Sequence, residues 1–191
     1  MIVTVCNGKG GAGKTTVAVL TALALRRSGH SVAVKDVDKQ GTATRWLERI
    51  GEQELLDGSE SAEYCIVDTP PDLDSPALHS ALASSALALL VSSPSPADLW
   101  TSQRTAQVIR QSMPAGQPAR IVFNQLQPRT ILSRNCEGLA RHIGLDTVRN
   151  GLRRRQCYQH AALLGWRALS RDAKSEIQCM VDEIKGLHSK P

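Results

Sequence analysis

A glycine-rich segment near the start of the chain restricts the possible folds more than any other feature of the sequence. Residues 8–15 read Gly-Lys-Gly-Gly-Ala-Gly-Lys-Thr and match the pattern G-x-x-x-x-G-K-[ST]. An apolar run at residues 2–6 precedes the segment and an Ala/Leu-rich run at 14–28 follows it, so it is expected to join a buried strand to a helix. Glycines allow successive backbone N–H groups to face one anion, and the helix N-terminus adds partial positive charge. The segment therefore predicts a phosphate-binding loop.

The side chains of this loop indicate a site for ATP and Mg²⁺. Lys14 is expected to hold the β- and γ-phosphates, and Thr15 a magnesium ion. A glycine-rich turn without a ligand is the alternative, but a chance match between a strand and a helix is rare. The loop residues expected to bind the nucleotide are Gly8, Lys9, Gly10, Gly11, Ala12, Gly13, Lys14 and Thr15.

Strands and helices alternate along the rest of the chain. Aromatic residues make up only 3% of it, so the core is expected to consist of Val, Ile, Leu and Ala, as in parallel strands covered by helices. The alternation predicts one α/β domain over residues 1–191, with the doubly wound, mostly parallel sheet and flanking helices of a P-loop NTPase. Strands are expected at 2–6, 31–36, 64–68, 86–92, 120–124 and 147–149. Helices are expected at 14–28, 42–50, 77–84, 97–113, 131–143 and 170–187.

Three aspartates follow predicted strands at the edge of the sheet where ligands of such folds bind. Asp68 ends the third strand, where a P-loop protein places a carboxylate of the magnesium shell. Asp36 and Asp38 follow the second strand, so that one could support magnesium and the other orient a water molecule. Their alternative role is to cap or turn the chain before the helix expected at 42–50.

Three motifs follow one another along the chain, namely Lys9-Gly10-Gly11-Ala12-Gly13-Lys14-Thr15-Thr16, Asp36-x-Asp38-x-Gln40-Gly41 and Ile66-Val67-Asp68-Thr69-Pro70-Pro71. Together and in this order they resemble the motifs of the ParA/MinD family of positioning ATPases. The likeness extends more weakly through Pro94–Trp100 and Arg155-Gln156-x-Tyr158, which resemble small plasmid-partition members such as ParF, and covers most of the chain.

The resemblance implies a role for several individual residues. By this likeness Lys9 reaches across a homodimer to the partner's nucleotide, so that ATP is sandwiched between the subunits. Lys9, Lys14 and Asp38 would then be catalytic, with Asp38 positioning the attacking water by electrostatic and geometric means. Thr16 would contact the α-phosphate and Asp36 would support the loop and magnesium. Asn124 would contribute to the purine pocket, although Asn is also common at strand ends.

Positive charge is concentrated in the last third of the chain. Residues 129–191 contain 12 Lys and Arg against 6 Asp and Glu, whereas residues 1–128 contain 11 against 12. Clustered cations of this kind suit the DNA backbone, and the resemblance implies DNA binding without sequence preference once ATP has formed the dimer. The alternative is a solvated basic face. The candidate DNA-binding residues are Arg149, Arg153, Arg154, Arg155, Arg167, Arg171 and Lys174.

Two departures from the family pattern put partner contacts in doubt more than ATP binding. The chain between Asp38 and Asp68 is shorter than in partition proteins, which suggests that an edge strand or helix is missing. In addition, Lys39 occupies a position where proline is usual.

The preferred hypothesis is an ATPase that positions a plasmid, a chromosome or a protein organelle such as the carboxysome, with a ParB-like or cargo-adaptor protein stimulating slow hydrolysis. A metabolic ligase of the same superfamily is the main alternative. A membrane-cycling division-site ATPase is disfavoured by the amphipathic pattern of the last helix, and an iron–sulfur carrier by the five dispersed cysteines, which read as reduced thiols. With no apolar run of about 20 residues, we expect a soluble protein of the bacterial cytoplasm, associated with the nucleoid and not with a membrane.

Overall fold

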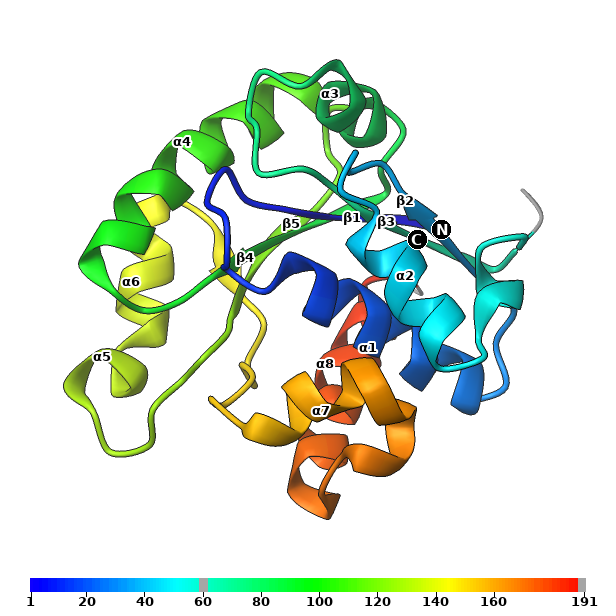
Figure 1. The fold of residues 1–191 in the computed structure, drawn as a ribbon. Helices are drawn as coiled ribbons and strands as arrows, with labels where there is room; N and C mark the ends of the chain where they lie inside the picture. The colour runs from blue at the N-terminus through cyan, green and yellow to red at the C-terminus, as the bar shows by residue number, and fades with distance from the viewer. Residues whose placement is uncertain (59–61, 189–191) are drawn as a thin grey trace.

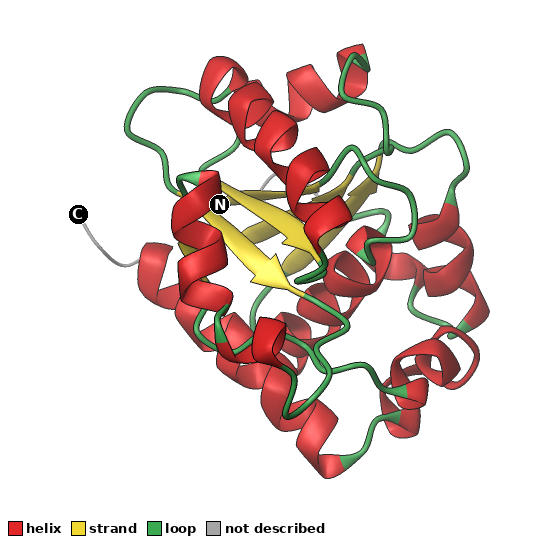
Figure 2. Cartoon of the chain, turned by 90° about the vertical axis from the view of Figure 1, so that its left-hand side faces the viewer, coloured by secondary structure: helices red, strands yellow, loops and turns green. Residues whose placement is uncertain are grey.

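The computed structural model describes residues 1–58 and 62–188, and its centre is one parallel sheet of six strands (Figure 2). The strand order is β2-β3-β1-β4-β5-β6. Because β1 lies between β3 and β4, Val5 has both Asp68 and Leu89 as register partners. The strands are β1 (Ile2–Cys6), β2 (Val32–Asp36), β3 (Tyr64–Asp68), β4 (Leu87–Ser92), β5 (Ala119–Phe123) and β6 (Asp146–Thr147).

Helices cover both faces of this sheet (Figure 1). Buried residues of α1, α2, α7 and α8 form one apolar cluster with one face, and those of α3, α4 and α6 form a second cluster with the other. This arrangement confirms the expected doubly wound fold. The helices are α1 (Lys14–Arg27), α2 (Thr42–Arg49), α3 (Pro76–Ala83), α4 (Pro96–Ser112), α5 (Ile131–Arg134), α6 (Cys136–Ile143), α7 (Gln156–Leu164) and α8 (Arg171–His188), with 3₁₀ turns at Gln53–Leu55 and Gly165–Ala168.

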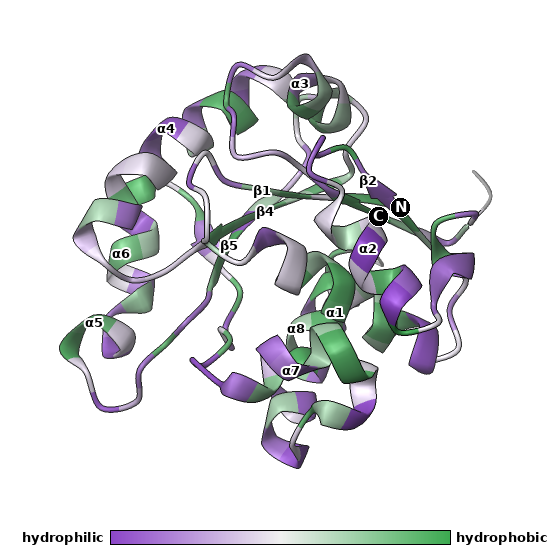
Figure 3. Ribbon diagram, in the orientation of Figure 1, coloured by the Kyte–Doolittle hydropathy of each residue, from purple (hydrophilic) through white to green (hydrophobic). Residues whose placement is uncertain are grey.

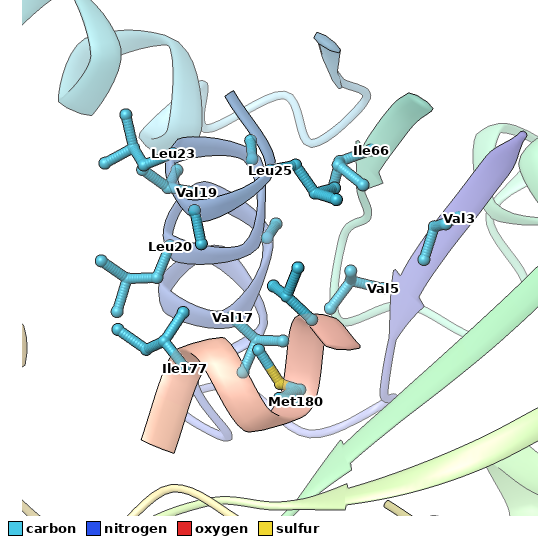
Figure 4. Packing of buried hydrophobic residues seen from close by; sticks show 14 of the residues in the cluster. Val3, Val5, Val17, Val19, Leu20, Leu23, Leu25, Ile66, Ile177 and Met180 are labelled. Atoms are coloured by element: carbon cyan, nitrogen blue, oxygen red, sulfur yellow. The ribbon is translucent and has the colours of Figure 1, made fainter. Parts of the chain in front are cut away.

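Helix α1 is buried on nearly all sides along its middle, where its sequence has no polar face. Every residue from Val17 to Leu25 is at most 1% exposed. The helix lies between the sheet and α8, so that Val17 and Leu20 approach Ile177 and Met180 while Leu25 faces Ile66 (Figure 4). In Figure 3 this helix is coloured mostly hydrophobic beyond its first turn. The buried helix fixes the direction of the loop that precedes it.

The expected elements of the first 124 residues are confirmed to within one or two residues at their ends. Between β2 and β3 the short connection forms α2 and a 3₁₀ turn, which leaves β2 at the edge of the sheet among the described residues. The last helix begins at Arg171 instead of residue 170, and its predicted apolar face is buried at Ala173, Ile177 and Met180.

Two expectations beyond residue 125 were wrong, and one helix was not predicted. The single helix predicted at 131–143 is two helices, because Asn135 leaves helical geometry (φ −106°, ψ 26°) to end α5 and begin α6. The strand predicted at 147–149 covers only Asp146–Thr147. Helix α7 was not predicted, since only Tyr158 and Ala161 on it are buried and two positions do not make a periodic pattern.

Candidate nucleotide-binding site

The loop that joins β1 to α1 has the geometry of an anion cradle. Gly11 and Gly13 adopt left-handed backbone angles, with φ of 77° and 95°. At Gly13 a Cβ atom would lie 2.0 Å from the Asn124 amide nitrogen, so only glycine fits. Helix α1 starts at Lys14, directly after this turn, so its N-terminus faces the same space as the loop.

Two asparagines hold the loop in place. The Asn7 amide donates to the Val91 carbonyl oxygen at 2.7 Å, and its side-chain oxygen accepts from the Lys9 N–H at 3.0 Å. The Asn124 amide donates to the Ala12 carbonyl oxygen at 3.0 Å. Asn7 was not predicted as a site residue, although a polar side chain between an apolar strand and Gly8 was an available signal. Asn124 thus supports the loop, and its predicted contact with the base stays a prediction.

A cavity of about 470 Å³ lies above the loop at the carboxyl ends of the strands, a size suited to a nucleotide. It is lined by most of the predicted nucleotide-binding residues, namely Gly10, Gly11, Gly13, Lys14, Thr15, Thr16 and Asn124, and by Asp38. The predicted residues Gly8, Lys9 and Ala12 belong to the loop but do not line this cavity, and neither do Asp36 and Asp68. The cavity is also lined by Arg153, Arg154, Arg155, Tyr158 and Gln159, which approach it from α7 and the segment before it.

Asp68 and Thr15 form the pair expected at a magnesium site. The Thr15 hydroxyl donates to one carboxylate oxygen of Asp68 at 2.6 Å. The other oxygen is buried and has no hydrogen-bond partner within residues 1–58 and 62–188. The same residues contain no cluster of three or more His, Cys, Asp or Glu that could hold a metal by themselves. This donor set fits a magnesium ion that Thr15, phosphate oxygens and water would hold directly. Asp68 would then act through its hydrogen bond with Thr15 or with a water molecule of the ion's shell.

The pKa of Asp68 is raised to about 6, mainly by burial of the carboxyl group. The hydrogen bond from Thr15 acts to lower this pKa, and the nearby Asp36 acts to raise it. Between its ordinary value of 3.8 and about 6, the folded chain holds a proton here that the unfolded chain has lost. Stability therefore falls as pH rises through this window, and above it the ionised carboxylate costs the ligand-free protein about 3 kcal/mol.

We expect Asp68→Asn to stabilise the protein measured without nucleotide and magnesium. The neutral amide removes the cost of burying charge, so the melting temperature at pH 7.5 should rise by about 6–12 °C and the difference should vanish near pH 4. Thermal unfolding from pH 4 to 8 measures this effect, with the exposed Asp146→Asn as a control. A variant less stable than wild type at pH 7.5 would contradict this account of Asp68.

Asp36 and Asp38 have different surroundings. One Asp36 carboxylate oxygen accepts from the Thr44 N–H at 2.9 Å, and the other accepts from the Asp38 N–H at 3.2 Å. Asp36 therefore fixes the first turn of α2, which was the alternative interpretation, and its predicted role at magnesium stays a prediction. Asp38 accepts from the Gln40 N–H at 2.9 Å and lines the cavity, as a residue that positions water must.

The two lysines of the loop point to different places. The Lys14 ammonium group donates to the Lys9 carbonyl oxygen at 3.2 Å and lines the cavity. Burial lowers the pKa of Lys14, while Asp68 and Asp38 act to raise it. The Lys9 ammonium group instead pairs with Asp98 in the first turn of α4. Burial acts to raise the pKa of Asp98, but hydrogen bonds from Lys9 and Ser93 lower it below its ordinary value, so this carboxylate stays ionised.

The predicted DNA-binding residues line more than one cavity. Arg153, Arg154 and Arg155 lie beside the nucleotide cavity, and the Arg155 guanidinium is held by Glu176 at 2.6 Å. Arg149 lines a neighbouring cavity, whereas Arg167 lines another with Arg27 and Arg49. Arg171 and Lys174 lie in the first turn of α8 and line none of these three cavities. Among the predicted residues that line a cavity, Arg167 is therefore the one that shares its cavity with no other member of the set.

None of the helices within residues 1–58 and 62–188 is both long and apolar enough to cross a membrane. The last helix, α8, instead buries its apolar side against α1 (Figure 4).

Comparison with known proteins places the loop and sheet in a family. Residues 3–165 match the family described as the CobQ/CobB/MinD/ParA nucleotide binding domain. The chain is 31% identical over 204 residues to the maintenance of carboxysome distribution protein A of Gloeobacter kilaueensis, covering 96% of this chain and 93% of that protein. It is 27% identical over 204 residues to the protein of that name from Halothiobacillus neapolitanus, covering 94% of each.

A solved structure shows the same fold. The septum site-determining protein MinD of Pyrococcus horikoshii, in complex with Mg-ADP, superposes with a TM-score of 0.78 at 15% identity, covering 98% of this chain and 97% of that one. The family match covers most of the chain, and the relative from Gloeobacter kilaueensis is more than 30% identical over nearly its whole length. Both findings agree with the geometry of the phosphate-binding loop. The chain belongs to the CobQ/CobB/MinD/ParA family of nucleotide-binding ATPases.

Proposed function

We propose that this protein binds ATP and Mg²⁺, forms a homodimer around the nucleotide, and in that state binds DNA without sequence preference to position a cellular cargo. Slow hydrolysis, accelerated by a partner protein, then returns it to the monomer and releases the DNA. Residues 1–191 act as one domain in this cycle.

The observation that carries the proposal is the separation of the two loop lysines. Lys14 lines the cavity of its own subunit, whereas the Lys9 side chain lies outside it, is 42% exposed and pairs with Asp98. A lysine in a phosphate-binding loop that does not face the cavity of its own chain is available to a nucleotide held by a second copy. A cation delivered in this way stabilises the charge that develops on the transferred phosphate.

The other polar side chains of the site would bind magnesium or position water during hydrolysis. Bound magnesium would neutralise charge on the β- and γ-phosphates. Thr15 would hold the ion, and Asp68 would accept a hydrogen bond from Thr15 or from water in the ion's shell. Asp38 would orient the attacking water at the mouth of the cavity. Most of the catalysis would come from positioning and electrostatics, as is usual in phosphoryl transfer.

The names of the two relatives favour a carboxysome as the cargo, since both are called carboxysome distribution proteins. We propose that this chain acts in the bacterial cytoplasm on the nucleoid, with an adaptor protein that links it to the cargo and stimulates hydrolysis. A metabolic ligase of the same superfamily is the second candidate, because the matched family is described by nucleotide binding alone and its description names no cargo. Such a ligase would consume ATP only with a carboxylate substrate and would ignore DNA.

Sedimentation of the purified protein with ATP, ADP or no nucleotide tests the ATP-dependent dimer. Asp38→Asn, which should bind ATP but hydrolyse it slowly, holds the ATP state long enough to measure. We expect this variant to double its mass with ATP and magnesium and to remain a monomer with ADP. A monomer in every state at tens of micromolar protein would rule out the proposed dimer.

A further inference from the structure

A separate cavity of about 320 Å³ lies where the C-terminal ends of α1, α2 and α7 meet. It is formed by the last residues of these three helices and by the 3₁₀ turn that follows α7. None of the residues that line it also lines the nucleotide cavity. We name it the α2–α7 cavity, and the side chains that matter for its chemistry are Arg27, Arg49, Leu163, Leu164, Trp166 and Arg167.

Positive charge predominates in the α2–α7 cavity. Among the described residues, three arginines and one carboxylate, that of Glu52, line it. The Glu52 carboxylate is already bound by Arg26 at 2.5 Å and lies 3.9 Å from Arg27. Arg49 and Arg167 form no ion pair within residues 1–58 and 62–188. An acidic segment of another molecule would therefore meet two guanidinium groups that have no carboxylate partner.

Two adjacent leucines border these arginines and stay in contact with water. Leu163 and Leu164 are 61% and 49% exposed, and neither belongs to the two apolar clusters formed by the described part of the chain. Trp166 is partly buried against the core, and the Arg27 guanidinium carbon lies 5.5 Å from the centre of its ring. Tryptophan and arginine often contribute most to binding at protein interfaces, and the leucines add apolar area beside them.

The walls of the α2–α7 cavity are fixed before a ligand binds. The Trp46 indole N–H donates to the Ala161 carbonyl oxygen at 3.0 Å, which joins α2 to α7 on the side of the sheet that α1 covers (Figure 1). Gly165 ends α7 with a φ of 66°, and a Cβ atom there would lie 3.6 Å from the Cβ atom of Ile50. A surface that is already ordered loses less conformational entropy when a partner binds.

We propose that the α2–α7 cavity binds a partner protein through a short segment in which two or more Asp or Glu residues flank a leucine, isoleucine or phenylalanine. Arg49 and Arg167 would pair with the carboxylates. The apolar side chain would pack on Leu163 and Leu164. This contact goes beyond the proposed function, since the cavity shares no residue with the nucleotide site.

Two other kinds of partner fit these residues less well. The phosphodiester backbone of a nucleic acid would use the arginines but leave the two leucines exposed to water. A lipid surface binds apolar side chains that project into it, whereas Trp166 is held against the core and lines a concave site. A protein segment uses the arginines and the leucines together.

The test begins with a library of random peptides selected on the nucleotide-free protein, with counter-selection on the variant Leu163→Ser, Leu164→Ser. We expect the enriched peptides to combine Asp or Glu with Leu, Ile or Phe. No enrichment, or enrichment of neutral or basic peptides, would overturn the proposal.

The affinity of an enriched peptide, labelled with fluorescein, is then measured for two cavity variants. Leu163→Ser with Leu164→Ser should weaken binding by at least about tenfold, and Arg49→Gln by at least about fivefold. Neither variant changes a residue of the nucleotide site, so the melting temperature and ATP hydrolysis should match wild type. Failure of the α2–α7 cavity would therefore leave the proposed function standing.

Matched controls carry the same substitutions outside the α2–α7 cavity. Ile131→Ser with Leu132→Ser changes another exposed apolar pair, on α5, and Arg104→Gln removes one charge from α4. Both controls should bind the peptide within about twofold of wild type. Equal losses in the cavity variants and their controls would overturn the proposal.

A random-sequence DNA duplex and vesicles of phosphatidylcholine and phosphatidylserine provide the last arm. We expect the cavity variants to bind both as wild type does. Variants that lose the duplex or the vesicles but keep the peptide would assign the cavity to a nucleic acid or a lipid and overturn the proposal.

Discussion

Lys14→Met is expected to weaken the binding of ATP by about 30-fold to several thousand-fold. Lys14 lines the cavity, and burial lowers the pKa of its ammonium group. Because this charge has already lost part of its hydration, an anionic phosphate in the cavity would stabilise it strongly. Removing one partner of a buried, hydrogen-bonded charge pair costs about 2–5 kcal/mol. Titration with a fluorescent ATP analogue in the presence of magnesium measures the loss.

The same variant separates binding from folding. Because the fold disfavours the charged form of Lys14, a methionine of similar length should leave the melting temperature without nucleotide unchanged or raise it slightly. Lys35→Met, on the exposed side of the edge strand β2, is the matched control and should bind ATP as wild type does. Normal ATP affinity in a folded Lys14→Met protein would show that the cavity is not the nucleotide site.

Lys9→Ala is expected to leave the binding of ATP to one subunit within about threefold of wild type but to reduce hydrolysis by at least about 100-fold. The reason is that the Lys9 ammonium group lies outside its own cavity, and a cation supplied in trans to a transferred phosphate contributes about 10³–10⁵ in related phosphoryl transfers. Phosphate release with saturating ATP measures the effect. If Lys9→Ala lost ATP affinity to the same extent as hydrolysis, Lys9 would act on the nucleotide bound by its own chain. That result would contradict a dimer in which Lys9 contacts the partner's nucleotide.

Asp98 provides a second readout for the same lysine. In Lys9→Ala the buried Asp98 carboxylate keeps its hydrogen bond from Ser93 but loses its cation, so some stability is lost for reasons unrelated to catalysis. Asp98→Asn releases Lys9 without removing it and should retain ATP-dependent hydrolysis. Hydrolysis that is lost equally in both variants would indicate that the ion pair, and not Lys9 itself, is required.

The phosphate-binding loop and the sheet could be predicted from sequence because local rules determine both. Glycine is required at Gly13, where a side chain would meet Asn124, and the continuous apolar runs of β1, β3 and β4 suit strands covered on both faces. The Ala/Leu-rich run was likewise sufficient to predict α1, whose residues from Val17 to Leu25 are apolar except for Thr21.

The residue roles that could not be predicted depend on tertiary structure. Asn7 joins the loop to β4 across 84 residues, and Asn124 supports the loop from 112 residues away, so both roles depend on contacts between segments that are far apart in the sequence. Asp36 could not be assigned between a cap and a metal ligand without the position of Thr44. The arginines were grouped by sequence, whereas the fold brings Arg129 beside Arg149 and moves Arg167 to another cavity.

DNA binding by an ATP-dependent dimer is tested best with a random-sequence duplex, wild type and Lys9→Ala, each with ATP, with ADP and without nucleotide, across a salt series. We expect wild type to bind in ATP only, binding to fall steeply with salt, and Lys9→Ala not to bind in any state. Wild-type binding that is equal in ATP and ADP, or absent in both, would contradict this expectation.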